Sequence, residues 1–111
     1  MVRVRIVLRR LSMSVSYLLK AASADTEGAE VALRVVGTRE PPSRMVIQIA
    51  ITGSAAVQIQ GRIARDAPWQ SLGPIHRDGA LFHVEPVQFL RAVASSVAAA
   101  TSVSVWAVWA W

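Results

Sequence analysis

Apolar and polar side chains alternate with a period of two along much of this sequence, and no other feature limits the possible fold as strongly. In residues 45–52, for example, every second position from 47 onward is an isoleucine (Ile47, Ile49 and Ile51). A period of two places alternate side chains on opposite faces of an extended chain, which is typical of a β-strand with one buried face. The isoleucine-rich segment is therefore predicted to be a strand, and one in the centre of its sheet.

The same alternation, interrupted by glycine and proline turn signals, predicts seven or eight strands and no helix. The predicted strands cover residues 2–19, 31–36, 45–52 and 55–62, one or two strands between 81 and 97, and 101–111. Gly53-Ser54 would close a hairpin between 45–52 and 55–62, and the Ala/Ser-rich stretch 94–104 would form a last hairpin. Residues 20–30, 37–44 and 63–80 are expected to be loops. Many short strands with close turn signals predict an all-β fold, an antiparallel β-sandwich or jelly roll.

Length and charge suggest one domain preceded by a basic segment. A chain of 111 residues can bury one core but is too short for two independent ones. Residues 1–20 contain five basic side chains and no acidic one, whereas residues 21–111 contain seven of each, so the first segment carries the whole net charge of +5. We therefore expect a basic N-terminal strand or arm over 1–20 and a single sandwich domain over 21–111. Such an arm suits an acidic surface of a protein, nucleic acid or lipid, and a solvated strand face is the alternative.

Nothing in the sequence predicts a catalytic, cofactor-binding or metal site. The chain has no cysteine, which excludes disulfides and thiolate metal ligands. His76 and His83 are the two histidines, and neither lies in a recognisable nucleophile motif. Asp78 and Glu85 lie near them, but a metal site needs three or four converging ligands. The six glycines are scattered one to a turn, so no phosphate-binding loop is expected, and no small-molecule substrate is predicted.

Two stretches resemble membrane-directed segments, but other features favour strands. Residues 1–24 begin with basic side chains and end in Ala-Ser-Ala like a signal peptide, yet serines interrupt the apolar part. Residues 92–111 have no charge over a length that could span a bilayer, but they contain five hydroxyl side chains and alternate with a period of two. Nucleic-acid binding is a weaker prediction, because Tyr17 is the only aromatic residue of the basic segment. No membrane partner is expected.

The tryptophans near residue 110 are the strongest candidates for contact with a partner. In the strand 101–111, Trp109 and Trp111 share one face and Trp106 lies on the other. A final strand is often at a sheet edge, and an edge with two apolar faces must be covered by its own chain or by a neighbour. The sequence thus predicts a homo-oligomer or a protein partner. The predicted partner-binding residues are Arg3, Arg5, Arg9, Arg10, Trp106, Trp109 and Trp111.

Residues 46–109 also carry a pattern that resembles a known family. The stretches "IQIAITGSAAVQIQGRIARDAPWQSL" and "GALFHVEPVQFLRAVASSVAAATSVSVWAVW" are similar to small β-sandwich structural proteins from the head genes of tailed bacteriophages. That family commonly has a "V-x-I-Q-G" strand, an aspartate-to-tryptophan turn, an "R-A-x-V" strand and a final "V-S-V-W" strand. The matching residues are Gly61, Trp69 and the pair Arg91-Ala92. The sequence departs from the family at "AAAT", where glycine is usual.

The resemblance implies a non-enzymatic virion structural protein without a cofactor. A capsid decoration or cement protein on the capsid surface, made in the host cytoplasm and bound to the major capsid protein or another virion protein, fits it best. A head–tail or tail accessory protein is the nearest alternative. In this interpretation Gly61, Trp69 and Arg91 are structural, with Trp69 as a buried plug at the end of the sandwich. A carbohydrate-binding β-sandwich, with Trp69 and a C-terminal tryptophan stacked on sugar rings, is an alternative from another class.

Overall fold

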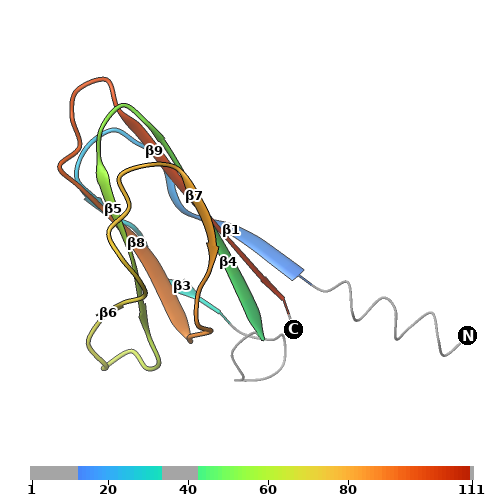
Figure 1. The fold of residues 1–111 in the computed structure, drawn as a ribbon. Coiled ribbons are helices and arrows are strands. Elements are labelled where there is room, and N and C mark those ends of the chain that lie inside the picture. The colour runs from blue at the N-terminus through green and yellow to red at the C-terminus, as the bar shows by residue number, and fades with distance from the viewer. Residues whose placement is uncertain (1–12, 34–42, 111) are drawn as a thin grey trace, which may run out of the picture.

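The fold is an all-β sandwich of two antiparallel sheets, as the alternation predicted. The computed structural model describes residues 13–33 and 43–110, and this part of the chain contains nine strands and no helix. Figure 1 shows the two layers packed face to face. Three of the nine strands have only two residues, and they lie in or next to segments expected to be loops. The predicted partner residues Arg3, Arg5, Arg9, Arg10 and Trp111 lie outside the described residues.

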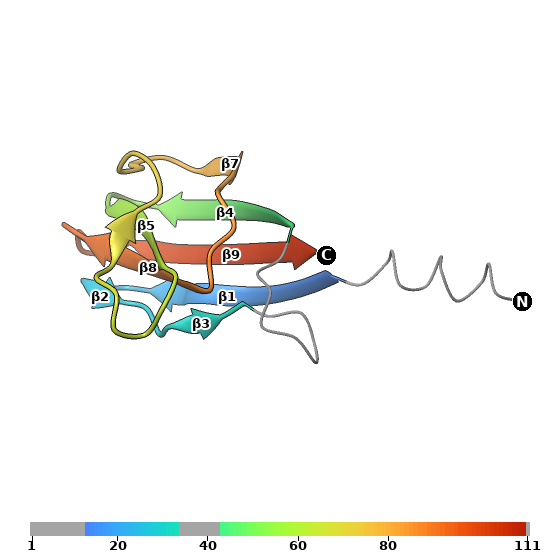
Figure 2. The same ribbon diagram turned by 90° about the horizontal axis from the view of Figure 1, so that it is seen from below.

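The first layer, here called sheet A, has four strands in the order β1-β9-β4-β7. Its strands are β1 (Met13–Ala22), β9 (Ser102–Ala110), β4 (Arg44–Thr52) and β7 (Ala80–His83). Figure 2 shows them side by side in this order. The boundary expected after residue 20 falls inside β1, so the residues from Met13 onward are part of the sandwich.

The second layer, sheet B, is built around β8 (Phe89–Ser95) and β5 (Ala56–Arg62), which pair along their whole length. β2 (Thr26–Glu27) and β3 (Val31–Ala32) pair with the other side of β8, and β6 (Gln70–Ser71) pairs with β5. The flanking strands are short because the chain enters and leaves these segments through turns rich in glycine, proline and polar residues.

Alternate residues of the strands β4, β5, β8 and β9 fill the core between the sheets, together with Leu18 and Leu19 of β1. Ile47 and Ile49 of β4 point inward, as the period of two predicted, and both are fully buried. The inward residues of β8 and β9 are also buried in the core. Burial of this apolar face is the main force that holds the layers together. The opposite faces of both sheets are left to solvent or to partners.

The two predicted hairpins do not form, because their strands belong to different sheets. β4 lies in sheet A and β5 in sheet B, and β8 and β9 are divided in the same way. Gly53 turns the first corner with φ of +100°, a backbone conformation in which a Cβ atom is strained. The hairpin predictions were wrong because alternation shows which residues of a strand point inward, but not which strand is its neighbour.

Strand β9 is central in sheet A, which corrects the expectation that it lies at an edge. It pairs with β1 from Ala110 to Val103 and with β4 from Ala110 to Ser102. The backbone groups of β9 are therefore used on both sides. A central strand needs no protection against edge-to-edge pairing, so only its outward side chains are available to a partner.

Candidate functional surfaces

Trp69 lies on the outer face of sheet B, between the side chains of two arginines. The guanidinium carbon of Arg62, on β5, is 4.3 Å from the centre of the indole ring, and that of Arg91, on β8, is 4.4 Å from it. Both distances are typical of cation–π contacts. Trp69 is half-buried in this position. Trp69 is thus held on the outer face of a sheet. The prediction that it is a buried plug at the end of the sandwich was wrong.

Hydrogen bonds hold both arginines in place. Arg62 donates from Nε and Nη2 to Oε1 of Glu30, and Arg65 donates to Oε2 of the same carboxylate at 2.9 Å. Arg91 donates from Nε to Oε1 of Gln60 at 2.8 Å, and its Nη1 lies 3.0 Å from a carboxylate oxygen of Glu27. We call these six residues, with Trp69, the Arg–Trp cluster. Its charged groups are paired with one another.

The strand register explains why the Arg–Trp cluster forms. Gln60 pairs with Arg91, and Arg62 pairs with Phe89, so two arginines stand diagonally on one face. Phe89 points outward yet is only 5% exposed. The guanidinium carbon of Arg65 lies 4.9 Å from its ring centre, and that of Arg62 lies 5.9 Å away. The arginines therefore cover an aromatic ring that would otherwise face water.

Gly61 points the other way, toward the interior. A Cβ atom at this position would lie 2.8 Å from Leu72 Cδ1 and 2.9 Å from Val87 Cγ2, closer than side chains pack. A cavity of about 320 Å³ lies beside it, and its apolar lining comes from residues after β5, namely Ile63, Ala67, Pro68, Leu72 and Val87. Gly61 is the penultimate residue of β5, in agreement with its predicted place at the end of a core strand.

The outer face of sheet A carries two rows of side chains that run across all four strands. The strand register aligns Tyr17, Trp106, Gln48 and Leu81 in one row. It aligns Val15, Val108, Val46 and His83 in the next row. We call these eight residues the sheet A face. None of them is an aspartate, glutamate, lysine or arginine, and six are apolar or aromatic.

The sheet A face is unusually exposed for its apolar character. Val15 is 63% exposed, Tyr17 44% and Leu81 70%. The rings of Tyr17 and Trp106 pack together, with their centres 5.3 Å apart and their planes at 41°. The ammonium of Lys20 lies 5.4 Å from the centre of the Tyr17 ring, at the border of the face. Contiguous apolar surface of this kind is typical of a protein-binding site.

The structure separates the tryptophans that the sequence grouped as partner contacts. Trp106 points outward on the sheet A face and is half-buried there. Trp109 instead packs in the core of its own chain and is 7% exposed, so it is not available to a partner of the folded protein. Tyr17 and Leu81 are exposed on the same face and were not among the predicted contact residues. The alternation of β1 grouped Tyr17 with Val15 on the apolar face of a half-buried strand, but the structure leaves both exposed. Leu81 could not be found without knowing that β7 pairs with β4.

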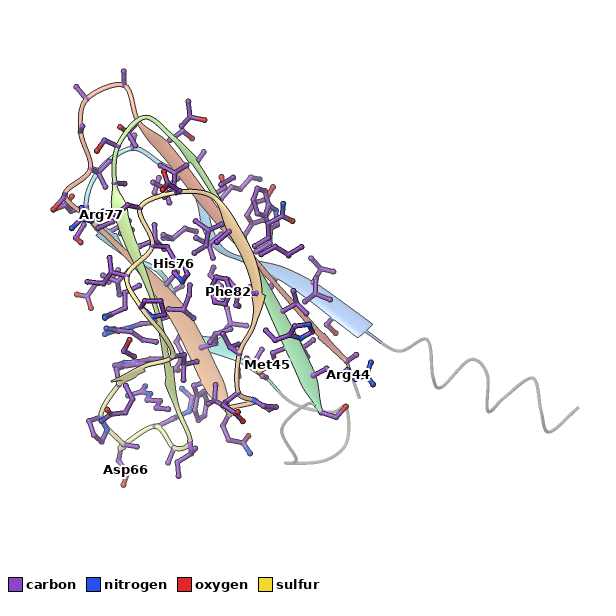
Figure 3. All side chains as sticks on the ribbon, in the orientation of Figure 1. Arg44, Met45, Asp66, His76, Arg77 and Phe82 are labelled. Carbon is purple, nitrogen blue, oxygen red and sulfur yellow. The ribbon has the colours of Figure 1, made fainter. Side chains whose placement is uncertain are left out.

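The histidines do not assemble a reactive group. His76 stacks on Phe82 with ring centres 4.5 Å apart and an angle of 15°, and its backbone pairs with that of Val57. The two rings lie near each other in Figure 3. Within residues 13–33 and 43–110, no three histidine, aspartate or glutamate side chains are placed to hold a metal ion. Among these same residues, no helix is long and apolar enough to cross a membrane.

Comparison with known proteins adds little. No family model matches the sequence, and no curated protein matches it. A crystal structure of PirA is similar with a TM-score of 0.38 and 14% sequence identity, over 87% of this chain and 82% of that chain. A similarity this weak supports no conclusion about function, so the two outer faces carry the functional argument.

Proposed function

We propose that the protein is a non-enzymatic structural component of a tailed-bacteriophage virion, a capsid decoration protein that binds major capsid subunits. The observation that supports this role is the sheet A face, a surface without aspartate, glutamate, lysine or arginine that carries two packed aromatic rings. Tyrosine and tryptophan are enriched where proteins meet, because they give a large contact area at a low cost in conformational entropy. Binding and stabilising a larger assembly need such a surface and no catalytic group.

The residues that carry the family resemblance meet on the other sheet, which favours a structural role for them. Trp69 from the turn is held by Arg91 from the "R-A" strand and by Arg62, next to Gly61 of the "Q-G" strand. Three separate parts of the pattern thus make one local arrangement. This arrangement fixes the loop after β5 and leaves the sheet A face free for docking.

The carbohydrate-binding alternative is less well supported. A sugar-binding tryptophan offers an open ring face beside polar groups that can bond to hydroxyls. The ring of Trp69 already has two guanidinium carbons within 4.4 Å. Gln60, a potential sugar-binding amide, donates to Oε1 of Gln58 and accepts from Arg91. A sugar would have to displace these groups before it could stack.

The proposal is tested on phage-like particles made by the organism that encodes the chain. Particles are purified on a density gradient, and the chain is measured in the particle fractions by quantitative mass spectrometry. Lys20 is the single lysine of the sequence and borders the sheet A face. A lysine-reactive cross-linker should therefore join Lys20 to the major capsid protein.

The outcomes separate the possible roles clearly. Many copies per particle and a Lys20 cross-link to the major capsid protein would support a decoration protein. A few copies per particle, cross-linked to head–tail or tail proteins, would replace it with an accessory role. Absence of the chain from purified particles would overturn the proposal.

A further inference from the structure

We propose that the sheet A face binds a second copy of this chain, so that two sandwiches pack back to back as a symmetric dimer. The proposal concerns the isolated protein and does not depend on a virion role; a capsid contact through the same face would replace the second copy on attachment. The neutrality of the face favours this occupant. None of its eight side chains is an aspartate, glutamate, lysine or arginine, so two copies can meet without burying an unpaired carboxylate, ammonium or guanidinium group.

The outer face of sheet A as a whole also has a suitable area. Its strands β1, β9, β4 and β7 have ten, nine, nine and four residues. With a rise of about 3.4 Å per residue and a spacing of about 4.8 Å between strands, they cover a flat area of roughly 500 Å². The accessible area of standing side chains is larger than the flat area beneath them. It therefore approaches the roughly 800 Å² per partner that a standard protein interface buries.

The arrangement of residues fits a two-fold contact. In a symmetric dimer each contact between two different residues occurs twice, once from each copy. Large side chains near the centre of the interface contribute most of the binding energy. Tyr17 and Trp106 are neighbours in one row, and Val108 and Val46 stand beside them in the next. Lys20 and Arg44 lie at the border, where a polar rim remains in water. Figure 3 shows Arg44 at one end of β4, away from the middle of the sheet.

The test is the oligomeric state of the full chain, measured by analytical ultracentrifugation. Protein concentrations run from about 1 to 100 µM, because specific interfaces of this size commonly have dissociation constants in the micromolar range or below. The parent chain is expected to be a dimer. Trp106→Lys and Leu81→Lys should each weaken dimerisation by about 30-fold or more, because each places a charge in an apolar contact. Leu81 is 70% exposed in the single chain, so Leu81→Lys should fold even if Trp106→Lys does not.

A matched control uses the opposite side of the molecule. Ile63 is 74% exposed in the loop after β5, and Ile63→Lys adds the same charge without touching the sheet A face. This variant should dimerise as the parent does. A parent chain that is monomeric at 100 µM would overturn the proposal. So would a dimer that is unaffected by Leu81→Lys, or one that Ile63→Lys disrupts equally. Attachment to particles is measured separately, so either proposal can fail alone.

Discussion

At the scale of single residues, Trp69 shows how a local environment changes the role that sequence suggests. The turn around it predicted a buried plug, but the ring lies half-buried on a sheet face beneath two guanidinium groups. Cation–π contacts contribute about 0.5–1 kcal/mol each at exposed sites, and more when water is excluded. Trp69 therefore stabilises the loop after β5 through the arginines of the sheet more than through the core.

Truncation of Trp69 is expected to destabilise the protein moderately. Trp69→Ala removes both cation–π contacts and part of the buried apolar area, and should lower the free energy of unfolding by about 2 kcal/mol. Urea unfolding followed by circular dichroism measures this change. Ile63→Ala, at an exposed position of the same loop, should change stability by less than about 0.5 kcal/mol. An unchanged midpoint for Trp69→Ala would show that the arginine contacts do not hold the loop.

Glu30 and Glu27 form ion pairs of the same type but in different environments. The side chain of Glu30 is 22% exposed and binds the similarly buried Arg62, whereas the side chain of Glu27 is 67% exposed. Glu30→Ala leaves Arg62 and Arg65 without their acceptor and should cost about 1–3 kcal/mol. Glu27→Ala should cost less than about 1 kcal/mol, because water screens exposed pairs. Equal losses in thermal unfolding for the two variants would contradict this difference.

At the scale of strands and turns, the two corners between the sheets are fastened to each other. Thr101, before β9, is buried; its hydroxyl accepts from the Ser54 amide at 3.1 Å and donates to the Ser54 carbonyl at 3.3 Å. The amide of Ala98 donates to the same carbonyl at 3.0 Å. One threonine side chain thus joins the β4–β5 corner to the β8–β9 corner.

Loss of the Thr101 hydroxyl should weaken both corners at once. Thr101→Val keeps the shape of the side chain but leaves the Ser54 amide without this acceptor, and should destabilise by about 1–2 kcal/mol. Thr101→Ser keeps the hydroxyl and should retain most of the stability. Hydrogen exchange of the Ser54 amide, read by NMR, should accelerate in the valine variant only. Comparable exchange in both variants would show that the hydroxyl does not protect this amide.

The strands themselves were largely predictable from sequence, but their neighbours were not. Period-two alternation identified β4, β5 and β9 and the inward faces of β4 and β5, because the side-chain period of a strand is a local property. Sheet membership depends on contacts between distant segments, which is why the two corners were predicted as hairpins. The same limit applies to the sites. Glu30 was placed in a loop, and its contacts with Arg62 and Arg65 span more than 30 residues of sequence.

At the scale of the whole molecule, charge and apolar surface are separated. The ion pairs of the described residues are those of the Arg–Trp cluster on sheet B, while the sheet A face is uncharged. The net charge of +5 arises from residues 1–20, which lead into β1 at an edge of sheet A. Of these basic side chains, Lys20 is among the described residues, and it lies at the border of the sheet A face.

If the protein attaches to a virion, this basic segment should strengthen attachment through charge. Replacement of Arg3, Arg5, Arg9 and Arg10 by glutamine removes four of the five basic side chains of residues 1–20. We expect this variant to attach more weakly to purified particles, as measured by co-sedimentation. The parent protein should also dissociate as the salt concentration rises, because the Debye length falls below its value of about 8 Å at physiological ionic strength. Replacement of Arg77 by glutamine, at an exposed position before β7, serves as the control and should have little effect. Attachment that is indifferent both to the four arginines and to salt would exclude an electrostatic role for the segment and leave the apolar face to carry the binding.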